Sequence, residues 1–362
     1  MHEQFLLAAL DQAWFGRGLC APNPSVGAVA VHKGQIIAQT WHRGAGTPHA
    51  EQLLLEQLPK NIPEITLYVT LEPCNHWGKT PPCVDAIIAY GIKKVVYAYR
   101  DPNPTIIVNN TPRLLSEHDV EVLHYPLPAI DDFYQSYRYW TLTKKPWVTV
   151  KMAQTMDGKI AGAQHERVYL SNASCAQFTH KNRLHSDVIL TTAQTVNQDD
   201  PLLNARIPGM DVAKPVAIID SRMTLNPQAK LLATASQCHI YFDEHYPMPA
   251  VHPNRSYHAV PAIQGLLDLN AVIHHLGQLG YHDIWVEAGG TLFSALHLAG
   301  LVNKTYLYIV PTVLGDSAVS AYHHADLFKK ACTVTWQAMG DNMIASLAWA
   351  SDPIQEHVCS QV

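Results

Sequence analysis

Apolar residues in the first 144 positions show two patterns, helical spacing and short runs rich in β-branched and aromatic residues. Helical spacing predicts helices at residues 3–14, 51–58, 81–90 and 131–140. The β-branched and aromatic runs predict strands at residues 26–31, 66–70 and 93–99. Thr47 and Pro48 are placed to cap and begin the second helix, and Gly91 is placed to end the third.

After the polar segment Thr143–Pro146, strands and helices alternate. Strands are predicted at residues 147–153, 187–191, 215–220, 283–286 and 305–310, and helices at residues 271–279 and 291–298. Strands interleaved with helices imply a mostly parallel sheet that is covered on both faces. Ligands bind such sheets at the carboxyl ends of the strands, which here carry residues 153–159, 191–200 and 287–290. We therefore predict two α/β domains, residues 1–144 and 145–362.

Composition supports two cores and argues against several classes of protein. The 362 residues are 48% hydrophobic, which is enough to build both cores. Only 15% are charged, the formal net charge is -5, and no basic cluster is longer than Lys144-Lys145, so we expect no nucleic-acid partner. No apolar stretch approaches the roughly 20 residues of a membrane span, and the first residues lack the basic start of a secretory signal. Seven scattered cysteines favour a reducing compartment, and we expect a cytoplasmic protein that does not bind membranes.

A potential metal site lies in the first segment. His49, Cys74 and Cys83 offer one nitrogen and two sulfurs, which are the ligands that Zn²⁺ prefers in tetrahedral geometry. Three protein ligands leave the fourth position open for a water molecule, and Glu51 is then placed as the proton shuttle. The order His-x-Glu followed by Pro-Cys and a second Cys is typical of zinc-dependent base deaminases. The pattern predicts one catalytic zinc ion per chain.

Alternatives to a catalytic zinc site remain open. A single His-x-Glu or a cysteine pair occurs by chance, and His76 as a fourth ligand would make a closed structural site. Eight residues separate the two cysteines, whereas base deaminases have two. This polar insert contains His76, Lys79 and Thr80, which can bind an anion such as a phosphate at a helix N-terminus, or it is a solvated loop.

Ordered motifs surround this potential site, at residues 22–29, 42–46, 48–51, 70–83 and 101–104. Together they resemble the deaminase half of the bifunctional riboflavin-biosynthesis deaminase/reductase family. The resemblance implies a cytidine-deaminase-like α/β/α domain in which His49, Cys74 and Cys83 bind zinc. It also implies that Asn23 holds the pyrimidine. The residues that it implies as contacts to the substrate and its phosphate are His42, His76, Lys79 and Thr80.

The second segment carries motifs at residues 151–161, 183, 195–206 and 286–290, which are similar to the reductase half of the same family. The resemblance implies a dihydrofolate-reductase-like α/β domain. It implies an NADPH site lined by Ala153, Tyr169, Thr195, Asp199, Gly289 and Gly290. It implies a substrate site formed by Arg167, Arg183, Leu203, Arg206 and Glu287.

Physical chemistry supports parts of this assignment and leaves alternatives. The guanidinium groups of Arg183 and Arg206 can bind phosphate oxygens bidentately, although either residue can instead form a salt bridge. Gly289-Gly290 lets backbone N–H groups approach a phosphate at a helix start, or serves only the geometry of a turn. In this half the sequence departs from the family pattern at three places: Thr155 replaces Ser, Tyr169 replaces Trp, and Thr192-Ala193-Gln194 replaces a glycine-containing turn.

The resemblance implies two reactions on small phosphorylated pyrimidines. The first is deamination of 2,5-diamino-6-(5-phosphoribosylamino)pyrimidin-4(3H)-one, and the second is reduction of 5-amino-6-(5-phosphoribosylamino)uracil with NADPH. Family members are homo-oligomers, and we expect the same here. Two alternatives are a zinc deaminase that acts on nucleic-acid bases, and a zinc deaminase whose reductase domain is degenerate and only binds or regulates.

Overall fold

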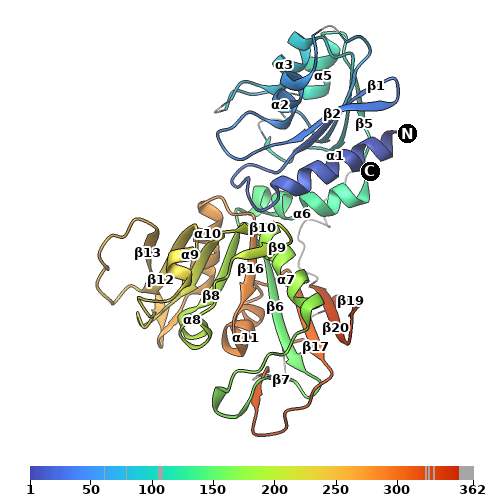
Figure 1. The fold of residues 1–362 in the computed structure, drawn as a ribbon. Coiled ribbons are helices and arrows are strands. Elements are labelled where there is room, and N and C mark those ends of the chain that lie inside the picture. The colour runs from blue at the N-terminus through green and yellow to red at the C-terminus, as the bar shows by residue number, and fades with distance from the viewer. Residues whose placement is uncertain are drawn as a thin grey trace. The chain divides into compact units, whose positions relative to one another are not determined.

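The protein is described here by a computed structural model that covers residues 1–349 apart from residues 61, 79, 105–107, 109, 323, 325, 326, 329 and 330. The chain divides into two compact units (Figure 1). Unit 1 contains residues 1–146 and 277–282, and unit 2 contains residues 147–276 and the chain from residue 283 onward. The described part of the chain contains no helix that is both long enough and apolar enough to cross a membrane.

Unit 1 is built on a sheet with strand order β2-β1-β3-β4-β5. Its strands are β1 Gly27–His32, β2 Gln35–Trp41, β3 Thr66–Leu71, β4 Lys94–Tyr99 and β5 Glu121–His124. Its helices are α1 His2–Gly16, α2 Ala50–Gln57, α3 Cys83–Tyr90, α5 Thr111–Ser116 and α6 Pro128–Thr143. Strands β3, β4 and β5 are parallel, and β1 pairs antiparallel with both β2 and β3.

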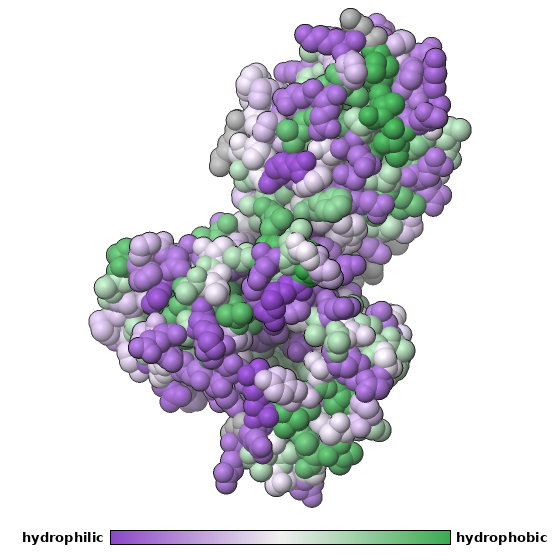
Figure 2. Space-filling model, viewed as in Figure 1, coloured by the Kyte–Doolittle hydropathy of each residue, from purple (hydrophilic) through white to green (hydrophobic). Residues whose placement is uncertain are grey.

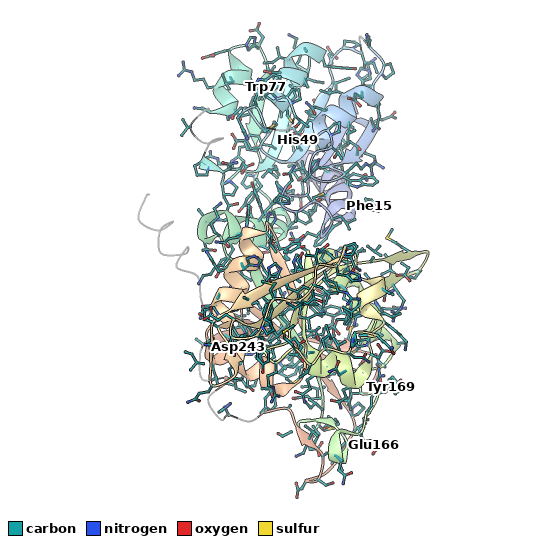
Figure 3. All side chains as sticks on the ribbon, turned by 90° about the vertical axis from the view of Figure 1, so that its left-hand side faces the viewer. Phe15, His49, Trp77, Glu166, Tyr169 and Asp243 are labelled. Atoms are coloured by element: carbon teal, nitrogen blue, oxygen red, sulfur yellow. The ribbon has the colours of Figure 1, made fainter. Side chains whose placement is uncertain are left out.

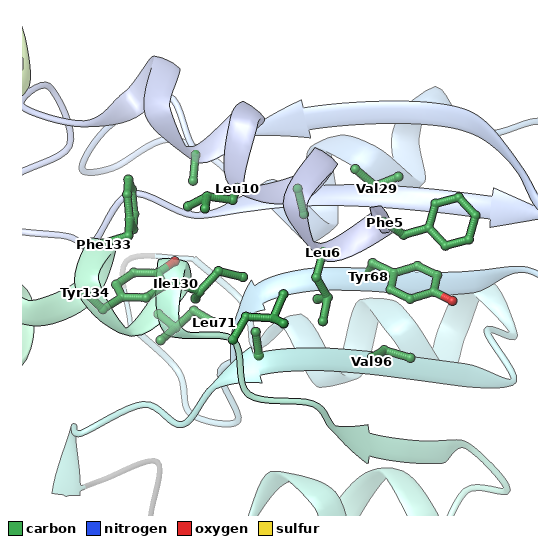
Figure 4. Close-up of a cluster of buried hydrophobic side chains, with 14 of the residues drawn as sticks. Phe5, Leu6, Leu10, Val29, Tyr68, Leu71, Val96, Ile130, Phe133 and Tyr134 are labelled. Carbon is green, nitrogen blue, oxygen red and sulfur yellow. The ribbon is translucent and has the colours of Figure 1, made fainter. Parts of the chain in front are cut away.

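Two hydrophobic clusters place the helices of unit 1 on opposite faces of this sheet. On one face, α1 and α6 pack against β1, β3 and β4 through side chains such as Phe5, Leu6, Val29 and Phe133 (Figure 4). On the other face, α2, α3 and α5 pack against alternate residues of the same strands. Gly27 permits the close approach of α1, because a Cβ there would lie 1.9 Å from a backbone oxygen of that helix. The result is an α/β/α layer arrangement.

Unit 2 is built on a larger sheet with strand order β13-β12-β11-β8-β16-β6-β17-β20-β19. The strands are β6 Trp147–Thr155, β8 Val188–Thr192, β11 Pro215–Ile219, β12 Gln237–Asp243, β13 Arg255–Val260, β16 Asp283–Glu287, β17 Lys304–Val310, β19 Cys332–Met339 and β20 Asn342–Trp349. The strands from β13 to β17 are parallel, and β20 and β19 are antiparallel additions at one edge.

The helices of unit 2 are α7 Ala173–His185, α8 Ala193–Asp199, α9 Leu231–Thr234, α10 Leu269–Gln278 and α11 Gly290–Leu298, with a short η1 at Ala163–His165. Helices α7, α8 and α9 pack on one face of the sheet, where they share buried clusters with Trp285, Tyr306 and Tyr308. The strand order reverses direction after β13, so the usual right-handed connection places α10 and α11 on the opposite face. Paired short strands are β7 Lys159–Ala161 with β18 Val319–Ser320, β9 Ala205–Ile207 with β10 Met210–Val212, and β14 Ala262–Ile263 with β15 Leu266–Leu267.

Most of the predicted helices and strands are present, and their bounds differ from the prediction by a few residues. The predicted cap of α2 was wrong: this helix begins at Ala50 with His49 as its N-cap. Helix α3 begins at Cys83, two residues after the predicted start. Thr47 lies before the helix, where its hydroxyl donates to the carbonyl of Gly44 at 2.7 Å. Several elements were not predicted. They include β2, most of whose residues are exposed, and also α7, the buried strand β12, and strands β13, β19 and β20.

Candidate active sites

Three potential metal ligands converge in unit 1. Nδ1 of His49 lies 3.2 Å from Sγ of Cys83 and 3.4 Å from Sγ of Cys74. A tetrahedral ion with bonds of ≈2.3 Å to sulfur and ≈2.0–2.1 Å to nitrogen separates such atoms by about 3.5 Å, so this donor set fits zinc. Among the residues that the structure describes, His76 is not part of the group whose donor atoms lie within 4.8 Å of one another. This geometry favours a three-ligand site over a closed one.

Helix starts and a strand end deliver these ligands. His49 caps α2, Cys83 is the first residue of α3, and Cys74 follows the end of β3. The backbone N–H of Cys83 donates to Sγ of Cys74 at 3.3 Å, and the positive end of the α3 dipole also favours negative charge on this sulfur. Glu51 lies in the first turn of α2, two residues after His49, and is 3% exposed. Its carboxyl group interacts electrostatically with His49.

The electrostatics of this cluster suit a divalent cation. A hydrogen bond from Cys83 lowers the pKa of Cys74 to about 4, and burial raises the pKa of Cys83 well above its usual range. Burial also raises the pKa of Glu51, and the charge of Cys74 raises it further. Without a cation, therefore, the cluster favours one thiolate. A bound cation would favour the second thiolate, because ligands bind metal ions in their deprotonated form.

Asn23 and His42 lie beside this cluster. Nδ2 of Asn23 lies 3.1 Å from Nε2 of His42, and Nδ1 of His42 lies 3.2 Å from the carbonyl oxygen of Pro48. The rings of His42 and His49 meet edge to face, with centroids 5.2 Å apart. Burial lowers the pKa of His42, so its ring is neutral at pH 7.

The loop between the two cysteines carries the other implied contacts. Oγ1 of Thr80 lies 3.3 Å from Nε2 of His49, the ring nitrogen that does not face the sulfurs. Nδ1 of His76 is buried and has no hydrogen-bond partner among the described residues, which leaves it available to a ligand. Lys79 lies outside the described residues. Figure 3 shows His49 inside unit 1, whereas Trp77 of this loop is 74% exposed.

Asp101 is a residue to which sequence reasoning assigned no role. It is 5% exposed, and its Oδ1 accepts hydrogen bonds from the backbone N–H of Asn103 and the hydroxyl of Tyr137. Burial raises its pKa to about 6, and the charges of Cys74 and His76 also act on it. The available signal was an acidic residue two positions after the end of β4, a buried parallel strand.

Unit 2 contains a cavity of about 1080 Å³ at the carboxyl ends of its parallel strands. This volume is at the upper end of the range for small-molecule sites. The implied site residues that line it are Ala153, Arg167, Tyr169, Arg183, Thr195, Asp199, Leu203, Glu287, Gly289 and Gly290. Arg206 is not among the lining residues; it is exposed, and its guanidinium donates to the side chain of Asn204. Polar residues cover much of the visible face of unit 2 (Figure 2).

Arg183 is engaged with a carboxylate inside this cavity. Its Nε and Nη2 donate to the two carboxylate oxygens of Glu287 at 2.6 and 2.9 Å, and its Nη1 donates to the carbonyl of Asn204 at 3.1 Å. Burial by itself would raise the pKa of Glu287, but Arg183 lowers it to about 2. Nε1 of Trp285 donates a further hydrogen bond to Glu287 at 2.8 Å. The sequence left two roles open for Arg183, phosphate binding and a salt bridge, and the structure shows it in a salt bridge.

Lys151 is a lining residue that sequence reasoning passed over. It faces Glu287 in the register of β6 with β16, and its Nζ lies 5.0 Å from the ring centroid of Tyr308. Burial lowers the pKa of its ammonium group, and Glu287 opposes this effect. The sequence feature that could have identified Lys151 is a cation in the middle of a mostly apolar strand. Such a charge is costly to bury unless it is paired, so it indicates a functional or ion-paired position.

Gly289 is not required by the backbone. Its φ of −71° and ψ of 175° are open to any residue, and a Cβ there would have no neighbouring heavy atom within 4 Å. The alternative that this glycine serves only turn geometry is therefore not supported. Because Gly289 lines the cavity, its missing side chain leaves room for a ligand at the start of α11.

Two departures from the family pattern have local structural roles. The hydroxyl of Thr155 donates to Asp157 and accepts from the backbone N–H of Lys159, which a serine hydroxyl can do equally. Thr192 is the N-cap of α8, and its hydroxyl accepts from the backbone N–H of Thr195 at 3.1 Å. A helix start thus replaces the glycine-containing turn.

The third departure, Tyr169, lies at the cavity surface. Tyr169, labelled in Figure 3, is 84% exposed. The guanidinium carbon of Arg167 lies 4.8 Å from the centroid of its ring. Nε of Arg167 also lies 3.8 Å from Oδ1 of Asp199. These three implied site residues form one polar group beside the opening, in which the aromatic ring supports the arginine through a cation–π contact.

Comparison with known families defines the class of the protein. Residues 1–99 match the family described as the cytidine and deoxycytidylate deaminase zinc-binding region. Residues 146–344 match the family described as the RibD C-terminal domain. The chain therefore joins a zinc-binding deaminase domain to a reductase domain, and the match over the second domain gives no support to a degenerate one.

Relatives that match across both domains identify the family. The chain is 32% identical to the riboflavin biosynthesis protein RibD of Escherichia coli (strain K12), over 87% of this chain and 89% of that protein. It is 33% identical to RibD of Haemophilus influenzae, over 92% of each. The structure of Acinetobacter baumannii RibD superposes with a TM-score of 0.84 at 28% identity, covering 97% of this chain and 99% of that chain.

A Thermotoga maritima structure described as a diaminohydroxyphosphoribosylaminopyrimidine deaminase/5-amino-6-(5-phosphoribosylamino)uracil reductase also gives a TM-score of 0.84, at 26% identity over 96% of this chain and 99% of that one. The chain belongs to the RibD family of riboflavin-biosynthesis proteins. It is a bifunctional enzyme, with a zinc-dependent deaminase domain and an NADPH-dependent reductase domain.

Proposed function

We propose that residues 1–144 deaminate 2,5-diamino-6-(5-phosphoribosylamino)pyrimidin-4(3H)-one and that residues 145–362 reduce the product, 5-amino-6-(5-phosphoribosylamino)uracil, with NADPH. The observation that carries the first half is the convergence of His49, Cys74 and Cys83 beside the buried Glu51. The cavity at the strand ends of unit 2 supports the second half. Both substrates are small phosphorylated pyrimidines.

In the deaminase site, His49, Cys74 and Cys83 hold the zinc ion. The ion, when bound, supplies a Lewis acid that lowers the pKa of water to about 7. Glu51 moves protons between this water and the leaving amino group, because burial raises its pKa toward the range in which a carboxyl group both accepts and donates. Its place in the first turn of α2 keeps it next to His49.

Substrate recognition in the deaminase site uses polar groups around the metal ligands. Asn23 holds the pyrimidine, and the neutral ring of His42 orients the Asn23 amide through their contact of 3.1 Å. His76, whose buried Nδ1 has no hydrogen-bond partner within the described part of the chain, and Lys79 contact the substrate and its phosphate. Thr80 was implied as a further contact.

In the reductase site, NADPH supplies the hydride, and the protein supplies binding and orientation. The cofactor-binding residues are Ala153, Tyr169, Thr195, Asp199, Gly289 and Gly290. The proposed substrate-binding residues that line the cavity are Arg167, Arg183, Leu203 and Glu287. Arg206, which the resemblance also implied, lies outside this lining. The salt bridge between Arg183 and Glu287 gives these two side chains a positioning role at the cavity wall, and Lys151 adds a cation beside them.

The chain forms a homo-oligomer in the cytoplasm and has no nucleic-acid or membrane partner. Its family membership supports the oligomer. The free cysteines Cys20, Cys175, Cys238 and Cys332 support a reducing compartment. The net charge of -5 argues against broad contact with nucleic acid.

The test is a pair of assays on the full chain. With the diaminopyrimidinone phosphate, ammonia should be released, and removal of zinc by a chelator should abolish this release. With the aminouracil phosphate, NADPH should be oxidised whether or not zinc is present. Absence of NADPH oxidation would contradict the reductase half, and ammonia release from fully zinc-free protein would contradict the deaminase half.

A further inference from the structure

The two ring nitrogens of His49 face different partners. Nδ1 faces the two sulfurs, at 3.2 and 3.4 Å, and Nε2 lies 3.3 Å from the hydroxyl oxygen of Thr80. Thr80 belongs to the segment directly before α3, the helix whose first residue is Cys83. The hydroxyl is therefore placed on the ring nitrogen that a metal ion at the cluster would leave free.

A second contact holds this segment against α2. The side-chain oxygen of Gln52 accepts from the backbone N–H of His49 at 3.3 Å, and its amide nitrogen donates to the carbonyl of Pro81 at 3.1 Å. Gln52 thus bridges the helix start that carries His49 and the residue that follows Thr80. The two hydrogen bonds of Gln52 therefore keep the Thr80 hydroxyl next to the imidazole of His49.

The chemistry of an imidazole ligand explains why this matters. A neutral imidazole carries one proton, and a metal ion requires the nitrogen that lacks it. A hydrogen-bond acceptor at the other nitrogen keeps the proton there and fixes the ring orientation. At His49, a proton on Nε2 donated to Thr80 leaves Nδ1 free to face the sulfurs.

We propose that Thr80 is a positioning residue for the zinc ligand His49, and that Gln52 holds Thr80 in place. The inference rests on the proposed role of His49 as a zinc ligand. It assigns Thr80 to the support of the metal site, whereas the resemblance implied a contact with substrate.

The experiment measures zinc affinity in the full-length protein, by competition between the protein and a chelator of known affinity with no substrate present. Thr80→Val removes the hydroxyl and keeps the shape, and it should weaken zinc binding by about 10- to 100-fold. Thr80→Ser keeps the hydroxyl and should bind zinc nearly as the unaltered protein does. Thr143→Val is the matched control, because Thr143 is also half-buried and donates to a carbonyl, but at the end of α6.

The outcomes separate a positioning role from a substrate contact. If Thr80→Val keeps normal zinc affinity and only raises KM for deamination, Thr80 contacts substrate and the proposal is overturned. If Thr80→Val proves not to fold by circular dichroism, Gln52→Met serves instead and should weaken zinc binding several-fold; unchanged affinity there would also overturn the proposal. If His49→Ala binds zinc as tightly as the unaltered protein, the proposed metal site itself fails, a result distinct from failure at Thr80.

Discussion

Each unit has a glutamate shielded from solvent at its candidate site, Glu51 in unit 1 and Glu287 in unit 2, and the pKa values of the two carboxyl groups shift in opposite directions. Burial raises the pKa of Glu51, and its neighbour Cys74 raises it further. Glu287 is half-buried, and the guanidinium of Arg183 lowers its pKa to about 2. The same residue type is thus suited to proton transfer in one unit and to a permanent ion pair in the other. The direction of each pKa shift follows the charge of the nearest partner, which is Cys74 for Glu51 and Arg183 for Glu287.

The largest expected effect is on the proton-transferring glutamate. Glu51→Gln should lower the rate of deamination by about 10²- to 10⁴-fold, because an amide of the same shape cannot accept and return a proton. Ammonia release measures this rate. NADPH oxidation with the aminouracil phosphate is the internal control and should not change. Deamination at the normal rate would remove Glu51 from the mechanism.

Substitution of the ion-paired Glu287 should lower the free energy of unfolding. Glu287→Gln leaves the guanidinium of Arg183 buried without its carboxylate, which should cost about 3–5 kcal/mol of the free energy of unfolding. Urea unfolding measures the loss. The double variant Glu287→Gln with Arg183→Met removes both charges and should be more stable than the single variant. If it is not, the salt bridge does not explain the low pKa.

A buried histidine gives a third case. Burial lowers the pKa of His239 from 6.5 to about 4, and its Nδ1 lies 3.3 Å from Nε2 of His258. Between pH 6.5 and pH 4 the unfolded chain therefore binds a proton that the folded chain does not, so the stability of unit 2 should be highest above pH 6.5 and fall as the pH drops. For His239 the loss at pH 5 is about 2 kcal/mol.

Denaturant unfolding at pH 7 and pH 5 measures this loss. The neighbouring His258 and His275 are half-buried, and their pKa values are also lowered by burial. His239→Leu removes one titrating ring and should make the stability depend less steeply on pH. An equal pH dependence in the variant would show that other groups account for it.

The smallest expected effect concerns a glycine in each unit. Gly289→Ala should weaken NADPH binding by about tenfold, because one methyl group enters the cavity, while the free energy of unfolding changes by no more than about 0.5 kcal/mol. Gly27→Ala is the contrasting variant, since its Cβ would meet α1 at 1.9 Å. It should destabilise unit 1 by about 1–3 kcal/mol and leave NADPH affinity unchanged. Equal NADPH affinity in both variants would remove Gly289 from the cofactor site.

Prediction from sequence worked best where a residue's role depends on near neighbours. The helix ending at Gly91, the strand before Cys74 and the alternating second domain are all present, because apolar spacing and stop residues act over a few positions. Prediction failed at β2, whose exposed residues carry no apolar alternation. It also misplaced the N-cap of α2, since the cap is set by the side chain of Gln52 and not by Thr47.

The cavity of unit 2 shows the limit of this reasoning. Ten of the implied residues line it, yet Arg206 does not, and Lys151 was passed over. Residues from Lys151 to Val319 meet there only because parallel strands end at the same edge of the sheet. A sequence can place a residue at a strand end, but it does not show which side chain turns into the cavity and which donates elsewhere.

By itself, the sequence determined the kinds of element, the division into two α/β segments and the donor atoms of a metal site, since these follow from spacing and from the chemistry of single residues. Only the tertiary structure decided the partners: Arg183 for Glu287, Thr80 for Nε2 of His49, and empty space beside Gly289. Partners decide pKa, tautomer and access because electrostatic interactions and hydrogen bonds act over a few ångströms, and the fold alone brings distant residues within that range.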